Sequence, residues 1–173
     1  MQVEEFSAAG LDLTCVDMSG ASKYRGFWET YYRESDAVVY VIDSAGAYLP
    51  PFPLRTFVYV RTSHVASILI SVLTLFFSSS PCSDEIRMAV VENELQALLE
   101  HGDLPPGIPV LVFANKKDLP TSLPPVNIAQ RLKLTEKFRS RPWQIMHTNA
   151  LTGEGLTEGM TWIGQMASPG QRR

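Results

Sequence analysis

Short apolar runs alternate along this chain with longer stretches that carry apolar residues at helical spacing. The apolar or alternating runs predict β-strands over residues 11–16, 37–43, 108–114 and 143–147. The other stretches predict helices over residues 22–32, 84–100, 125–132 and 156–166. Because strands that alternate with helices usually form a mainly parallel sheet covered on both faces, we expect a doubly wound α/β fold.

A polar turn, Asn115-Lys116-Lys117-Asp118, directly follows the strand predicted over residues 108–114. Open α/β sheets place ligand sites at the carboxyl ends of their strands. An ionised Asp118 only accepts hydrogen bonds, so it suits the ring N–H and the exocyclic amine of guanine, a pair of donors that adenine does not offer. Asn115 can donate and accept, and the stem of Lys116 can lie along the base while its ammonium stays in water. Alone, the turn fits a plain strand-to-helix connection as well.

Two further segments at strand ends favour the guanine interpretation. In Asp17-Met18-Ser19-Gly20, the carboxylate of Asp17 could hold a metal-bound water, and the backbone N–H of Gly20 could approach a terminal phosphate. In Thr148-Asn149-Ala150, the small Ala150 would let a backbone N–H reach the carbonyl oxygen of guanine. The three segments occur in the order that a guanine-nucleotide domain needs, which is a stronger signal than any one of them.

With these motifs the chain resembles an Arf-like (ADP-ribosylation-factor-like) small GTPase, and within that family it is most similar to the member linked to cilia and the BBSome coat. The resemblance is carried by DMSG at 17–20, YRGFWETYY at 24–32, AVVYVIDSA at 37–45, NKKD at 115–118 and the segment 142–163. It covers residues 2–45 and 84–166. It implies a sheet of the P-loop NTPase type.

The resemblance also implies ligands, partners and a place in the cell. The ligands would be GTP or GDP with Mg²⁺, the metal being held on the side of Asp17. The protein would be a guanine-nucleotide switch in membrane or ciliary trafficking, cytoplasmic and located at membranes or at the ciliary base. Effector or coat proteins would bind the switch region at 24–32, although an aromatic cluster of this kind is more often part of a core. Peripheral membrane association is a further expectation.

Parts of the family pattern do not occur in the printed residues. No G-x-x-x-x-G-K-[ST] phosphate loop is found, and residues 3–6 match the second strand of the family rather than its first. Ala21 stands where the family has a Gln that orients the attacking water. We therefore expect a domain that lacks its first strand and phosphate loop, with impaired nucleotide binding and hydrolysis. The alternative is a nucleotide-free protein-interaction module.

Residues 46–83 interrupt the resemblance. From this interruption we predict an incomplete domain at 1–45 and 84–167, an insert at 46–83 and a tail at 168–173. The insert contains 65–77, thirteen residues without charge. The codons that encode Gly46 and Ser83-Asp84 permit intron borders, so a translated intron that forms a poorly packed excursion is the preferred interpretation. The alternatives are a strand that replaces the missing central one and membrane association through 57–77, although a span needs ~20 apolar residues.

Composition and charge limit the classes of protein to which this chain can belong. The chain of 173 residues is 45% hydrophobic and 19% charged, which is enough for one domain with a sizeable core. A net charge of −3 gives no support for nucleic-acid binding. The two cysteines form neither a disulfide framework nor a metal-ligand spacing, and the first residues do not resemble a signal peptide. A reducing compartment fits these features.

Overall fold

The computed structural model describes residues 2–8, 11–17, 29–33, 35–45, 58–61, 67–73 and 82–167. For residues 2–8, 11–17, 30–31, 58–61, 67–73, 82–87 and 90, the description covers the backbone only. The strands are β1 (Gln2–Ala8), β2 (Leu11–Asp17), β3 (Ala37–Asp43), β4 (Val58–Arg61), β5 (Ser67–Leu73), β6 (Val110–Asn115) and β7 (Trp143–His147). The helices are α1 (Glu29–Tyr32), α2 (Cys82–Glu100), α3 (Pro125–Arg131), α4 (Leu134–Lys137) and α5 (Leu156–Ala167).

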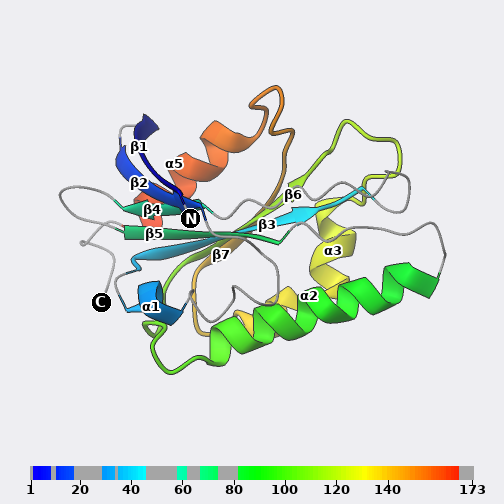
Figure 1. Ribbon diagram of the computed structural model, residues 1–173. Coiled ribbons are helices and arrows are strands. Elements are labelled where there is room, and N and C mark those ends of the chain that lie inside the picture. Colours follow the sequence, from blue (N-terminus) through cyan, green and yellow to red (C-terminus); the bar gives the residue numbers. More distant parts are fainter. Residues whose placement is uncertain are drawn as a thin grey trace.

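A five-stranded sheet in the order β4-β5-β3-β6-β7 forms the centre of the fold (Figure 1). The pairs β5–β3, β3–β6 and β6–β7 are parallel, and only the edge pair β4–β5 is antiparallel. Strands β1 and β2 form a separate antiparallel ribbon. The register aligns Asp43 with Asn115 and Ala114 with His147, so the carboxyl ends of β3, β6 and β7 meet at one edge of the sheet. The predicted mainly parallel α/β sheet is confirmed.

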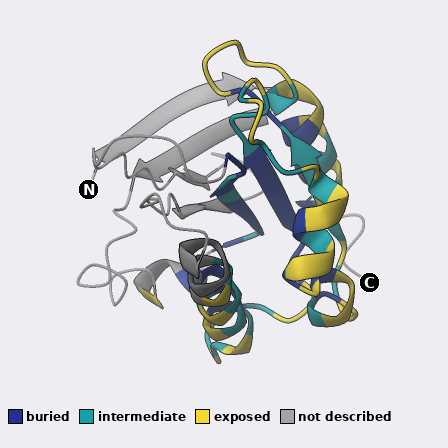
Figure 2. Cartoon of the chain, turned by 90° about the vertical axis from the view of Figure 1, so that its right-hand side faces the viewer, coloured by how far each residue is buried: buried dark blue, intermediate teal, exposed yellow. Residues whose placement is uncertain are grey.

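Helices cover both faces of the sheet (Figure 1). The face toward α2 and α3 buries Val38, Tyr40, Ile42, Val110, Val112 and Ala114 of β3 and β6 together with Val91, Leu95 and Ile128 of the helices. The face toward α5 buries Ala37, Val39, Leu111 and Phe113 together with Met160, Ile163 and Ala167. Alternate residues of β3 and β6 therefore enter opposite core layers, as the two-residue period of a strand requires. Figure 2 shows these strands buried between helices with exposed outer surfaces.

Helix α5 packs closely on β6 at Gly159. A methyl group placed on Gly159 would lie 2.3 Å from Cε1 of Phe113 and 3.2 Å from Cδ2 of Leu111. Native side chains do not approach so closely, so the absence of a side chain at this position sets the distance between helix and sheet.

The predicted helices at 84–100, 125–132 and 156–166 are confirmed by α2, α3 and α5. Of the helix predicted over 22–32, the structure describes the last turn, α1, and residues 22–28 lie outside the described part. The short helix α4 was not predicted. Among the helices of the described ranges, none has both the length and the apolar composition needed to cross a bilayer.

The expectation that the whole of 46–83 forms an excursion outside the sheet is wrong for Ser67–Leu73. This segment is β5, and its backbone pairs with β3 from Ala37–Ile68 to Ile42–Leu73. Its sequence, SILISVL, is short, apolar and rich in β-branched residues, which suits a strand inside a sheet. Pairing also satisfies the backbone N–H and C=O groups along the second edge of β3. The alternative, a strand that replaces the missing central strand, therefore describes Ser67–Leu73 better than an excursion does.

Candidate functional site

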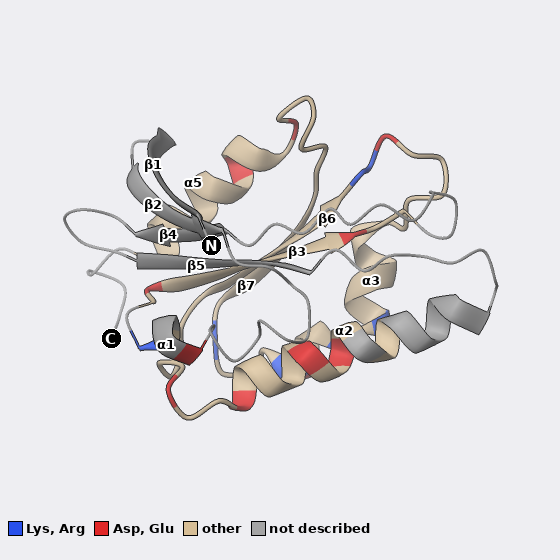
Figure 3. Ribbon diagram, viewed as in Figure 1, with Lys and Arg blue, Asp and Glu red and all other residues tan. Residues whose placement is uncertain are grey.

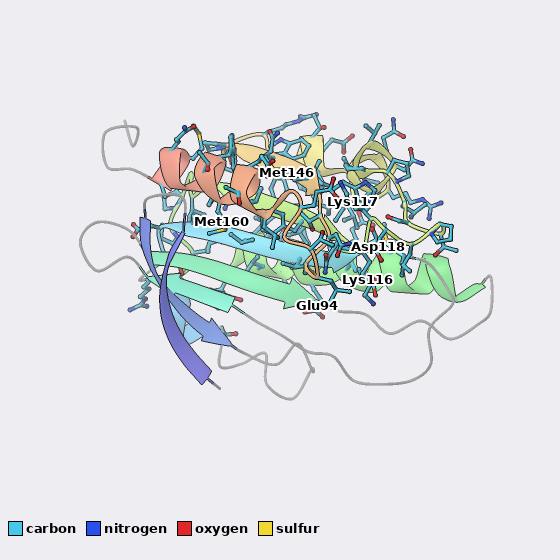
Figure 4. All side chains as sticks on the ribbon, turned by 90° about the horizontal axis from the view of Figure 1, so that it is seen from above. Glu94, Lys116, Lys117, Asp118, Met146 and Met160 are labelled. Atoms are coloured by element: carbon cyan, nitrogen blue, oxygen red, sulfur yellow. The ribbon has the colours of Figure 1, made fainter. Side chains whose placement is uncertain are left out.

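The turn after β6 has a defined backbone. Asn115 is the last residue of β6, and Lys116 adopts a left-handed conformation with φ of 67°. The N–H of Leu119 donates to the carbonyl of Lys116 at 3.1 Å and closes the turn. This geometry leaves Asp118 exposed, and no hydrogen bond or ion pair of Asp118 is found within the described ranges. Figure 4 shows Lys116, Lys117 and Asp118 together at one end of the sheet.

The loop after β7 is organised around Asn149, which is buried. Its Oδ1 accepts the N–H of Leu151 at 2.9 Å, and its carbonyl accepts the N–H of Gly153 at 2.9 Å. Its own N–H donates to the carbonyl of Glu154 at 3.0 Å. A side chain that bonds the backbone two residues ahead stabilises a tight turn. Asn149, which the sequence argument passed over in favour of Ala150, therefore shapes this loop.

Four contacts join the two loops, and one of them runs from the hydroxyl of Thr148 to Oδ1 of Asn115 at 3.4 Å. Oδ1 of Asn115 accepts the N–H of Ala150 at 2.9 Å, and the N–H of Lys117 donates to the carbonyl of Thr148 at 3.0 Å. The ammonium of Lys117 and the carboxylate of Glu154 form an ion pair. Asn115 and Ala150, two of the predicted site residues, are therefore in direct contact. The Ala150 N–H, expected to face a base, donates to Asn115 instead, so a guanine carbonyl would have to share it.

The sequence argument expected the ammonium of Lys116 to stay in water, but in the structure this ammonium pairs with a carboxylate. Nζ of Lys116 lies 2.6 Å from Oδ2 of Asp43, and 29% of the Lys116 side chain and 11% of the Asp43 side chain are exposed. Oδ1 of Asp43 accepts the N–H of Ala45 at 3.0 Å. Asp43 is the last residue of β3 and Lys116 follows β6, so the register of the sheet brings this pair together. In the sequence, the position of Asp43 at the end of a predicted strand was the signal that could have revealed this ion pair.

The predicted phosphate and metal side falls largely outside the described part. Asp17 is the last residue of β2, only its backbone is described, and Gly20 lies outside the described residues. Within the described ranges, no group of three or more His, Cys, Asp or Glu side chains could hold a metal ion. The assignments of Asp17 and Gly20 to Mg²⁺ and phosphate thus stay predictions, and no chemical step is derived through the metal.

The described end of the predicted effector segment belongs to the core. Tyr32 is buried, and its ring meets the ring of His101 edge-on at 4.9 Å between centroids. Burial, followed by the negative charges of Glu29 and Glu94, raises the pKa of Tyr32. Arg33 and Asp103 form an ion pair at 2.6 Å beside this contact. Residues 24–28 lie outside the described residues, so partner binding by this segment stays a prediction.

Charged side chains form ion pairs both on α2 and near the two loops. Figure 3 shows acidic residues along α2, and Glu92 of this helix lies 3.6 Å from Lys133 and 3.4 Å from Lys137. Near the two loops, burial and the positive charge of Lys117 lower the pKa of His147, and Glu154 opposes this shift. This shift favours the neutral form of the His147 ring.

Comparison with known proteins gives consistent matches. The sequence model of the ADP-ribosylation factor family matches residues 1–48 and 78–167. ADP-ribosylation factor-like protein 6 of Danio rerio is 35% identical over 162 residues, which cover 93% of this chain and 66% of that protein. ADP-ribosylation factor-like protein 3 of Chlamydomonas reinhardtii is 33% identical over 161 residues, which cover 93% of this chain and 68% of that protein. The chain thus spans about two thirds of the length of these relatives.

Among solved structures, the Arl6 BBS3 small GTPase of Trypanosoma brucei, determined with the nucleotide analogue GppNp, matches with a TM-score of 0.49 and 23% identity. The match covers 76% of this chain and 97% of that one. Members of the matched family are small GTPases that in general bind GTP or GDP, Mg²⁺ and effector proteins. The sequence model of the family matches more than half of the residues of this chain. Together with the parallel sheet and the helices on both of its faces, this match shows that the chain belongs to the ADP-ribosylation factor family.

Proposed function

We propose that the loops after β6 and β7 hold the guanine base of GTP or GDP. Asp118 would accept hydrogen bonds from the ring N–H and the exocyclic amine of the base. Its exposure at the tip of a closed turn supports this role, since the carboxylate is accessible and has no other partner within the described ranges. Ala150, exposed in the facing loop, would lie on the other side of the base.

The observation that carries this proposal is the hydrogen bond from the Ala150 N–H to Oδ1 of Asn115 at 2.9 Å. It joins directly two loops whose contacting residues are 35 positions apart in sequence. A site whose parts are already held in place loses less conformational entropy when it binds. Asn115 would then act as the organiser of the pocket, and Asp118 as the group that distinguishes guanine from other bases.

The wider role rests on the family and on the sequence. We infer a guanine-nucleotide switch in membrane or ciliary trafficking, with Mg²⁺ held on the side of Asp17 and Gly20 placed toward the terminal phosphate. Effector or coat proteins would bind around 24–32, and the protein would act in the cytoplasm, at membranes or at the ciliary base. Residues 1–45 and 84–167 would form the family domain, with 46–83 inserted between them in sequence and a tail at 168–173; within the insert, Ser67–Leu73 joins the sheet as β5.

We also infer that the 173-residue polypeptide, taken as printed, binds and hydrolyses GTP weakly. It contains no G-x-x-x-x-G-K-[ST] segment, whose backbone N–H groups and Lys hold the phosphates. Ala21 offers no group to orient an attacking water. Base recognition then has to be measured at high nucleotide concentration, where contacts of the base alone are detectable.

Backbone NMR of the purified chain tests the base site. Titration with millimolar GDP should shift the amides of residues 115–119 and 148–151, and ADP at the same concentration should leave them nearly unchanged. The amides of α5 beyond Gly159 serve as an internal reference, because they lie outside the proposed pocket. Equal shifts with GDP and ADP would contradict guanine recognition, and shifts confined to other regions would place the ligand elsewhere.

A further inference from the structure

A continuous chain of short polar contacts lies behind the proposed pocket. Nε2 of His147 lies 2.6 Å from Oγ of Ser122, and Oγ of Ser122 lies 2.7 Å from Oγ of Ser44. Oγ of Ser44 in turn lies 2.5 Å from the carbonyl oxygen of Asn115. Ser44 is buried, and the other two side chains are half-buried. The contacts link the ends of β3, β6 and β7 through one residue of the loop before α3.

The direction of these hydrogen bonds follows from the acceptor at one end. A carbonyl oxygen only accepts, so the hydroxyl of Ser44 donates to Asn115. Because a hydroxyl has a single proton, Ser44 must accept from Ser122, and Ser122 must accept from His147. The opposite direction would bring two oxygens without an intervening proton to 2.5 Å. The carbonyl of Asn115 also accepts the N–H of Ser44 at 3.0 Å, so both of its lone pairs are used.

We propose that His147, Ser122 and Ser44 form a hydrogen-bond relay that positions Asn115, with His147 donating through Nε2, and that His147 and Ser122 thereby act as positioning residues for base recognition. The second part rests on the proposed guanine site. The relay fixes the carbonyl of Asn115, whose side chain holds Ala150. Loss of the relay would let the end of β6 shift and would loosen the contact between the two loops.

The structure favours this role over simple satisfaction of buried polar groups. A water molecule could satisfy Ser44 and Ser122 one at a time, but three linked side chains from separate elements fix one geometry. His147 directly precedes Thr148, whose carbonyl accepts the N–H of Lys117 at 3.0 Å. Each end of the relay therefore adjoins one of the contacts that join the two loops.

The protonation state of His147 can be read without any nucleotide. Long-range proton–nitrogen NMR of the full chain labelled at histidine nitrogens should show, at pH 7, a proton on Nε2 of His147 and a bare Nδ1. The His147→Gln variant assigns the signal by its disappearance. A proton on Nδ1 instead would overturn the relay, because Nε2 could then only accept from Ser122.

The positioning role is tested by base selectivity. The measured quantity is the ratio of the dissociation constants for GDP and its xanthine analogue in the full chain. His147→Leu and Ser122→Ala should reduce the preference for GDP by about fivefold, the effect of one lost hydrogen bond of about 1 kcal/mol. His147→Gln should restore most of it, because the amide can donate to Ser122.

The variants separate this inference from the proposed function. If Asp118→Asn reverses the preference while His147→Leu leaves it unchanged, the guanine site stands and the positioning role is wrong. If His147→Gln behaves like His147→Leu, donation by residue 147 is not what matters, and the role is again wrong. If Asp118→Asn changes nothing, the proposed guanine site fails, and the positioning role fails with it. The NMR result on the unmodified chain decides the relay itself, whichever variants fold.

Discussion

The side chain of Asn115 holds the backbone of Ala150 through one hydrogen bond of 2.9 Å between Oδ1 and N. The two residues follow neighbouring parallel strands, β6 and β7, and the bond spans the gap between the loops that those strands enter. This contact joins two segments that were both predicted to bind the base, 115–118 and 148–150. Its removal should therefore affect both loops.

Replacing Asn115 by Leu should lower the free energy of unfolding by about 1–3 kcal/mol, because it removes the acceptor of the Ala150 N–H. Asn115→Asp keeps an acceptor at nearly the same position and should cost less. Urea denaturation gives the stability, and hydrogen exchange of the Ala150 amide reports the local effect. Unchanged exchange at Ala150 in Asn115→Leu would contradict the contact.

Two glycines of the loop after β7 form a matched pair. Gly153 and Gly155 both have left-handed backbones, with φ of 82° and 79°. A methyl group on Gly155 would lie 2.6 Å from the carbonyl oxygen of His147, whereas one on Gly153 would meet nothing within 4 Å. Both Ala variants should suffer the backbone cost of about 1 kcal/mol, and Gly155→Ala should lose about 1–3 kcal/mol more. Thermal unfolding of the two variants side by side measures the difference, and equal losses would refute the close approach.

Helix packing gives a similar comparison. Gly159→Ala should lower the free energy of unfolding by about 1–3 kcal/mol, because the added methyl would clash with the buried ring of Phe113. Gly102→Ala is the control, since nothing lies within 4 Å of a methyl group there. Chemical denaturation measures the free energy of unfolding of both variants. A Gly159→Ala variant more stable than the parent chain would show that α5 packs less tightly on β6.

The lowered pKa of His147 predicts a pH dependence with a definite sign. The unfolded chain binds a proton at this ring near the ordinary pKa of 6.5, and the folded chain binds it only at lower pH. Neutral His147 thus contributes stability that is complete above pH 6.5 and is lost as the pH falls through the lower, folded value. Urea midpoints between pH 5 and 7.5 should fall less in His147→Gln than in the parent chain. Parallel curves would contradict the shift.

The elements that could be predicted are those that local pattern determines. The strands β3, β6 and β7 and the helices α2, α3 and α5 follow from apolar periodicity and turn residues. The position of Asn115, Lys116 and Asp118 at the end of a buried strand followed from the same reasoning.

Interactions between distant segments were not accessible in this way. Lys116 and Asp43 are 73 residues apart, and only the register of β3 and β6 shows that they pair. The relay from His147 to Ser44 depends on two such registers, those of β3 with β6 and of β6 with β7, and on the loop that carries Ser122. The place of β5 was also missed, because its apolar run fits an excursion and a central strand alike until the free edge of β3 is considered.

The most direct test of the guanine site is the base preference of Asp118→Asn. The parent chain should bind GDP more tightly than its xanthine analogue, and the variant should reverse this order, because its amide can donate to the additional carbonyl oxygen of xanthine. Glu158→Gln, which removes one exposed carboxylate from α5, should keep the order of the parent chain. Titration of the three proteins with both nucleotides gives the dissociation constants. Reversal in Asp118→Asn alone is the result that the account predicts, and the same preference in all three proteins would contradict it.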